Sequence, residues 1–219
     1  MEQEQAWGVI AQQRRVLADL LADLTPQEWE APSLCARWRV RDVAAHLALT
    51  PHSPGIGRIL YECLRARGDV DRVNHDMTVR WAARPTAELV AGLRSDADNR
   101  RRPAITTWRN LLFDTIVHVQ DVAIPLGRDV AMPLAGTVAG LDRVWRMGWP
   151  FWAKRRLRGL RLVATDAEWA AGAGAEVRGP AGALLLLVTG RGAVARPRLD
   201  GPGVAHLAPQ ADTTVPDGP

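Results

Sequence analysis

Two segments of this chain carry an aspartate and a histidine four residues apart, and both segments have the apolar flanks of a buried helix. Asp42 and His46 lie in DVAAHLAL, and Asp114 and His118 lie in LLFDTIVHVQDVAI. Side chains four residues apart share one face of an α-helix. If both faces point into a helix bundle, two imidazoles and a carboxylate meet as the ligands of a divalent metal site. The same spacing also arises by chance, and two partly buried, hydrogen-bonded histidines are the usual alternative.

The composition is that of a soluble globular protein. The chain has 219 residues, 47% of them apolar, which allows one large domain or two small ones. No apolar run reaches the length of about 18 residues that a membrane helix needs. The polar start, MEQEQAWGVIAQQRR, lacks a signal-peptide core, so we expect a cytoplasmic protein. Its two cysteines, Cys35 and Cys63, are expected to be reduced thiols rather than a disulfide.

The positive charge does not point clearly to nucleic acid. The net charge is +4 and the pI is about 10, but the excess is arginine and it is scattered. The densest clusters, 100–102 and 154–161, are not interleaved with aromatic residues in the manner of a single-strand binding surface. A solvated face is the favoured interpretation, and no nucleic-acid partner is expected.

Helical periodicity dominates residues 1 to about 153. Thr25, Pro26 and Glu28 have the pattern of an N-cap, a proline in the first turn and a capping box. Apolar spacing, prolines and glycines predict helices over roughly 5–24, from 39 onward, 57–67, 71–83, after Pro85, from Thr106 or Thr107 to Gly127, and 134–154.

The character of the sequence changes near residue 157. Strand patterns follow at 159–166 and 176–178, then a buried helix in AGALLLLVTGR and a final strand within 196–207. The sequence therefore predicts a mainly α protein with a helical bundle over 1–156 and a small α/β module over 157–208. Residues 209–219, rich in proline and aspartate, are expected to be a disordered tail.

Several runs together resemble a known family. LTPQEW at 24–29, PSLC at 32–35 and WRVRDVAAHL at 38–47 are similar to the opening of the mycothiol-dependent maleylpyruvate isomerase family, within the DinB-like superfamily. DTIVHVQD at 114–121, followed by PLGR, resembles the family's second metal-bearing helix, and EVRGP at 176–180 with LDGPG at 199–203 resembles its appended module. The resemblance implies a DinB-like four-helix bundle that holds one divalent metal, usually zinc.

Position by position, the resemblance implies His46, Asp114 and His118 as the metal ligands. The family often has glutamate where this chain has Asp114, whose side chain is one methylene shorter. Three protein ligands leave a coordination position open, as in catalytic zinc sites. In the family that position activates mycothiol, the low-molecular-weight thiol of actinobacteria, and the Ala/Arg/Gly-heavy composition fits such a source. The implied reaction is thiol addition to a small electrophilic substrate, with an isomerase or an S-transferase outcome.

Other polar residues have plainer interpretations. Asp42 fits a helix start better than a fourth ligand. Asp121, three residues after His118, either orients that imidazole or is solvated. Cys35 is expected to be a structural thiol away from any base. The remaining histidines have no repeated carboxylate partner and are not expected as ligands: His52, His75 and His206.

Two other classes of function compete with the enzyme. The first is a non-catalytic DinB-like binding or regulatory protein, which could keep the metal without any thiol chemistry. The second is a DNA-associated role, which would show as steeply salt-dependent binding. The substrate, the arginine that would reach it among Arg191, Arg196 and Arg198, and the choice between monomer and dimer stay open.

Overall fold

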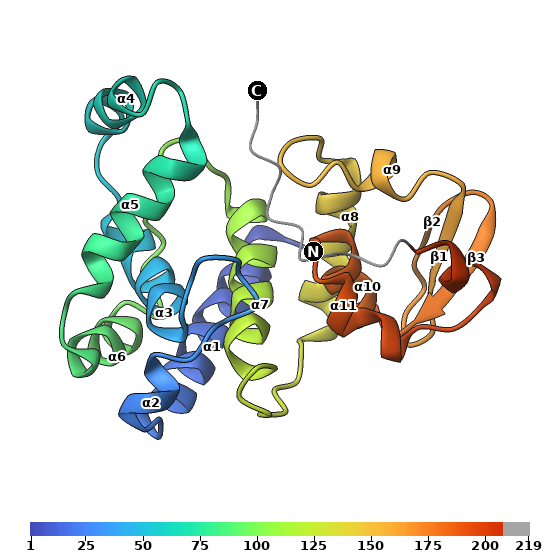
Figure 1. Cartoon of the computed structure of the whole chain (residues 1–219), viewed down its shortest axis with the longest axis horizontal. Coiled ribbons are helices and arrows are strands. Elements are labelled where there is room, and N and C mark those ends of the chain that lie inside the picture. The colour runs from blue at the N-terminus through green and yellow to red at the C-terminus, as the bar shows by residue number, and fades with distance from the viewer. Residues whose placement is uncertain (208–219) are drawn as a thin grey trace. The chain divides into compact units, whose positions relative to one another are not determined.

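The computed structural model describes residues 1–207, which pack as two compact units, residues 2–130 and residues 131–207 (Figure 1). The strands begin near the predicted change of character, but the compact units divide between Val130 and Ala131. The reason is that α8 (Leu134–Arg146) packs against α10 (Ala181–Val188). As domain bounds, 1–156 and 157–208 stay a prediction, and the expected tail at 209–219 lies outside the described residues.

The N-terminal unit is built from helices at the predicted places. They are α1 (Gln3–Ala22), α2 (Pro26–Trp29), α3 (Val40–Leu49), α4 (Ile56–Arg65), α5 (Val70–Ala82), α6 (Thr86–Ser95) and α7 (Trp108–Ala123), with a 3-10 turn at Thr50–His52. Local hydrogen bonds explain two of the starts. Thr25 and Glu28 form the predicted capping box, and the Thr107 hydroxyl accepts from the Asn110 amide at 3.3 Å to cap α7.

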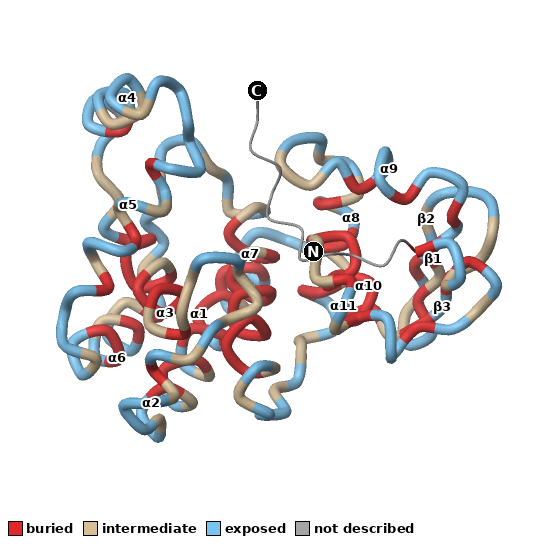
Figure 2. Tube along the Cα trace, viewed as in Figure 1, coloured by how far each residue is buried: buried red, intermediate tan, exposed pale blue. Residues whose placement is uncertain are grey.

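The core of this unit lies where α1, α3, α6 and α7 face one another. Helix α1 packs on α6 and α7, while α3 packs on α5, α6 and α7. Their facing sides are buried (Figure 2). Leu17 of α1, Val43 of α3, Leu89 of α6 and Val119 of α7 are at most 1% exposed. Because α3 and α7 are in contact inside this core, their polar side chains are brought to one place.

The C-terminal unit combines short helices with one sheet. Its elements are α8, α9 (Ala153–Arg156), β1 (Leu160–Ala164), β2 (Ala170–Gly172), β3 (Ala175–Gly179), α10 and α11 (Gly192–Ala195). Strand β1 is central, antiparallel to β2 and parallel to β3. Leu162 of β1 pairs with Val177 of β3, and both are fully buried.

Gly174 and the leucine-rich helix α10 shape the packing of the C-terminal unit. Gly174 turns the chain between β2 and β3 with φ +121°, and a Cβ there would lie 2.0 Å from the Gly159 carbonyl oxygen. All eight residues of α10 are buried, as expected for a helix that is apolar on every side. No helix in residues 1–207 is long and apolar enough to cross a membrane.

Three details of the predicted C-terminal part are wrong. The helix expected over 134–154 breaks after Arg146, because Pro150 cannot continue a helix, and α9 starts anew at Ala153. Strand β2 was missed because Ala-Ala-Gly has no alternating or β-branched pattern. The final strand expected in 196–207 is two 3-10 turns, with only an isolated bridge between Asp200 and Arg178. The prolines at 197 and 202 cannot donate to a ladder.

Candidate metal centre

Helices α3 and α7 bring His46, Asp114 and His118 together. The Nε2 atom of His46 lies 3.4 Å from Asp114 Oδ2, and the Nε2 atom of His118 lies 3.3 Å from Asp114 Oδ1. The two imidazole rings are 4.9 Å apart between centroids. One ligand atom from each of the three residues lies within 4.8 Å of the others. The structure thus places the three residues as the spacing predicted, and their role as metal ligands stays a prediction.

The burial of α7 fixes the position of the cluster, while the exposure of Asp114 leaves the cluster accessible to solvent. Every residue from Leu111 to Ala123 is buried except Asp114. The Asp114 side chain is 33% exposed, against 17% for His46 and 11% for His118. The imidazoles are therefore fixed by the packed bundle, while the carboxylate keeps the cluster open to solvent.

The electrostatics of the cluster favour a positive charge at its centre. Desolvation alone would raise the pKa of Asp114, but the charge and hydrogen bonds of His118 and His46 hold that pKa far below its usual range. Burial alone would lower the pKa of His118, whereas Asp114, Cys35 and Asp121 raise it well above its usual value. Both shifts favour the ionised forms, a carboxylate on Asp114 and an imidazolium on His118.

The donor set fits a divalent transition metal. Ligands at about 2.0–2.2 Å in a tetrahedron are about 3.3–3.6 Å apart, and each imidazole Nε2 lies at such a separation, 3.4 or 3.3 Å, from a different oxygen of Asp114. Imidazole nitrogen and carboxylate oxygen suit zinc and its neighbours better than calcium or magnesium. Three such ligands leave at least one position for an outside molecule.

Asp121 and Cys35 lie on the Nδ1 side of the His118 ring. The sequence predicted a contact with His118 only for Asp121, and only as one of two alternatives. The His118 Nδ1 atom is 2.8 Å from Asp121 Oδ2, and the Asp121 side chain is fully buried. Of the two alternatives for Asp121, orienting His118 or facing solvent, the structure shows contact with His118. The three-residue spacing between Asp121 and His118 was the sequence feature that indicated this contact. Cys35, expected away from any base, instead lies with its Sγ 3.0 Å from Asp121 Oδ2 and 3.6 Å from His118 Nδ1.

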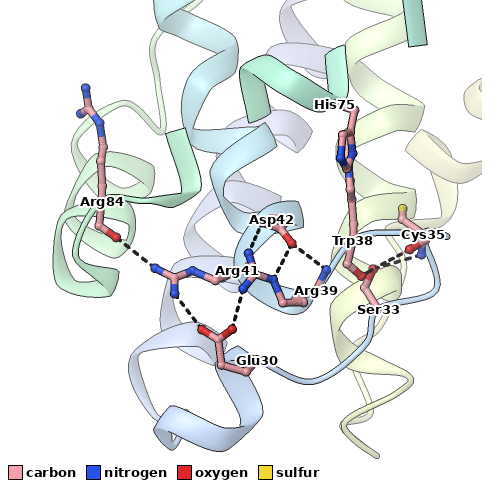
Figure 3. A network of polar contacts seen from close by, with 9 residues as sticks. All are labelled: Glu30, Ser33, Cys35, Trp38, Arg39, Arg41, Asp42, His75 and Arg84. Atoms are coloured by element: carbon pink, nitrogen blue, oxygen red, sulfur yellow. Dashed lines mark hydrogen bonds and ion pairs between the residues drawn. The ribbon is translucent and has the colours of Figure 1, made fainter. Parts of the chain in front are cut away.

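Trp38 covers the two imidazoles from the loop between α2 and α3. Its ring lies 5.1 Å from the His46 ring and 6.1 Å from the His118 ring, between centroids. Its indole N–H donates to His75 Nδ1 of α5 at 2.8 Å, as Figure 3 shows. His75 is therefore a support for Trp38 rather than a member of the cluster. Trp38 forms an aromatic wall beside the cluster.

Asp42 has the role of a helix-start carboxylate. It accepts from the Arg39 backbone N–H at 2.9 Å and from the Arg39 Nε and Nη2 atoms at 2.9 and 3.0 Å (Figure 3). Arg39 and Arg41 also share Glu30, which lies at the end of α2. This network fixes the first turn of α3, one turn before His46.

Two of the other histidines, His52 and His206, are not members of the cluster. The His52 Nε2 atom lies 2.5 Å from Asp96 Oδ2, and the His52 ring stacks on Trp81. His206 is an exposed residue of the C-terminal unit. That unit also holds the three arginines considered as anion ligands, Arg191, Arg196 and Arg198.

A comparison with known protein families finds a match in the N-terminal unit. Residues 10–104 match the family model described as the mycothiol maleylpyruvate isomerase N-terminal domain. That segment, somewhat less than half of the chain, is similar to this domain. The match confirms the resemblance seen in the sequence, and it contains Trp38 and His46 but ends before Asp114 and His118.

The whole fold also has a solved counterpart. The chain is similar to the crystal structure of a histidine-to-alanine mutant of the mycothiol-dependent maleylpyruvate isomerase, with a TM-score of 0.56 and 14% identity. The likeness covers 100% of this chain and 97% of that one. At this identity it shows the shared fold, a mainly helical protein with a small C-terminal sheet. No curated protein matches the chain significantly.

Proposed function

We propose that this protein is a metal-dependent enzyme that activates mycothiol and adds it to a small electrophilic substrate. The observation that carries the proposal is the convergence of His46, Asp114 and His118 in a chain that contains the family's N-terminal domain. The proposed metal is zinc. The name of the structural neighbour favours an isomerase outcome over an S-transferase outcome.

Each residue of the cluster has a distinct part in this proposal. The Nε2 atoms of His46 and His118 and one carboxylate oxygen of Asp114 would hold the metal. A bound divalent metal with an open position supplies the positive charge that keeps a thiol deprotonated near neutral pH. Asp114 offsets part of that charge, and its exposed side leaves room for the thiol to enter.

The proposed bond-making and bond-breaking steps take place between the thiol and the substrate. The thiolate sulfur forms a C–S bond with an electrophilic carbon, and the electron pair of the attacked double bond moves onto the activating carbonyl. Rotation about the resulting single bond, followed by cleavage of the C–S bond, returns the thiol and gives the isomer. If the C–S bond persists, the outcome is a transferase. Trp38 offers a flat apolar surface for a planar unsaturated substrate beside the imidazoles.

The test is turnover of maleylpyruvate and a panel of other electrophiles by the purified protein, with and without zinc and mycothiol. We expect turnover that needs both. His46→Ala should abolish it, and Asp114→Asn should lower it but recover in part with added zinc, since both imidazoles remain. The control is His206→Ala, an exposed histidine of the other unit. An equal thiol-addition rate with and without zinc would overturn the proposal and favour a binding or regulatory protein.

A further inference from the structure

Both nitrogens of the His118 ring have acidic neighbours. Nε2 faces Asp114 and Nδ1 faces Asp121, at 3.3 and 2.8 Å. We propose that Asp121 is a positioning residue of the metal centre, which holds the His118 ring with its proton on Nδ1 and its Nε2 lone pair aimed at Asp114 and His46. This inference rests on the proposed metal-binding role of the cluster.

The hydrogen bond between His118 and Asp121 has a defined donor and acceptor. A neutral imidazole carries one N–H, and an ionised carboxylate can only accept. In the neutral ring that a metal ligand requires, the bond from Nδ1 to Asp121 Oδ2 therefore fixes the proton on Nδ1 and leaves the Nε2 lone pair for a metal. Because the Asp121 side chain is fully buried and lies one turn further along α7, water does not compete for this bond. A carboxylate behind a metal-binding imidazole commonly fixes its tautomer and orientation.

Asp121 also holds the loop that carries Trp38. Its Oδ2 atom accepts from the Cys35 thiol at 3.0 Å, and its backbone carbonyl accepts from the Leu34 N–H at 3.1 Å. Within the same loop, the Ser33 hydroxyl donates to the Trp38 carbonyl at 2.8 Å. One buried aspartate thus sets both the imidazole and the position of the aromatic wall over it.

The two roles of Asp121 can be separated by substitution. Cys35→Ala removes the thiol bond to the loop but leaves the carboxylate on His118. Asp121→Asn keeps the volume and removes the charge, while Asp121→Ala removes the acceptor. If Asp121 acts on His118, zinc affinity should fall roughly 10–100-fold in Asp121→Ala and by a smaller factor in Asp121→Asn. The zinc affinity of Cys35→Ala should equal that of the wild type.

The tautomer gives a readout that needs no activity. Ring ¹⁵N and ¹H spectra of the wild-type protein, recorded zinc-loaded and at a pH where the metal-free ring is neutral, should show His118 protonated at Nδ1. In Asp121→Ala the Nε2-protonated form should gain population. This wild-type measurement and the isosteric Asp121→Asn variant decide the matter even if Asp121→Ala fails to fold.

Three results would overturn the inference. The first is a wild-type His118 protonated at Nε2, and the second is unchanged zinc affinity in a folded Asp121 variant. The third is an equal loss of zinc affinity in Cys35→Ala, which would make the loop the important element. Zinc binding with the expected tautomer but no thiol chemistry would overturn the proposed catalysis and support this inference. A wild-type protein that binds no zinc would overturn both.

Discussion

At the scale of single residues, the arrangement around His118 differs from that of a merely buried histidine. Its ring is held from both sides by carboxylates, and one of these, Asp114, is shared with His46 and partly exposed. A histidine that only satisfies a core hydrogen bond needs one such partner. The second carboxylate and the second imidazole exceed that need, and they are the features that a cation would use.

Replacing His118 with alanine should remove most of the zinc affinity and leave the bundle folded. The reason is that the surrounding core is built from leucine, valine and alanine rather than from the cluster. Zinc titration and far-UV circular dichroism of the metal-free variant test this, with His206→Ala as the matched control. Unfolding of His118→Ala at low temperature would show instead that His118 has a structural role.

Asp96, just after α6, gives a prediction of pH dependence away from the metal centre. Burial opposes its ionisation, but hydrogen bonds from Asn99 and His52 and the charge of Arg14 lower its pKa below 3.8. A lowered folded-state pKa stabilises the protein above the unfolded value, and that stability is lost as the pH falls through the folded value. Wild type should therefore exceed Asp96→Asn in unfolding free energy at neutral pH, and the gap should shrink below pH 3.8. Urea unfolding at several pH values measures the gap; a constant gap would contradict the assignment.

At the scale of elements, helices were predictable where periodicity and caps agreed. Thr107 and the apolar pattern after it located α7, and the spacing of Asp114 and His118 then placed both on one face. The loop between α2 and α3 was not predictable in this way. Its path depends on contacts distant in sequence, such as the Leu34 N–H to the Asp121 carbonyl. Cys35 and Trp38 reach the cluster only through that path, so nothing local in the sequence could place them.

The leucine-rich helix α10 should be the most sensitive element of the C-terminal unit. Leu186 is fully buried, so Leu186→Ala should cost about 2–5 kcal/mol of unfolding free energy. Leu64→Ala on α4, where the side chain is 79% exposed, should change it by less than about 0.5 kcal/mol. Denaturant unfolding of both variants compares them. A cost for Leu186→Ala as small as that for Leu64→Ala would contradict the packing described for α10.

At the scale of the whole molecule, the two comparisons cover different parts of the chain. The family model covers residues 10–104, with one of the three proposed ligands, whereas the structural likeness extends over the full chain. The shared fold therefore includes the C-terminal unit, which lies outside the family match. Asp114 and His118 lie outside the family match, and the proposal that they bind a metal rests on the geometry of α3 and α7.

The most direct test of the metal centre is a zinc-loaded crystal measured at the zinc absorption edge. The account predicts one anomalous peak at about 2.0–2.2 Å from an imidazole nitrogen of His46, an imidazole nitrogen of His118 and a carboxylate oxygen of Asp114. The neighbouring group of Cys35, His118 and Asp121 also has ligand atoms within 4.8 Å of one another. A peak at that group, or no peak at either, would contradict the account.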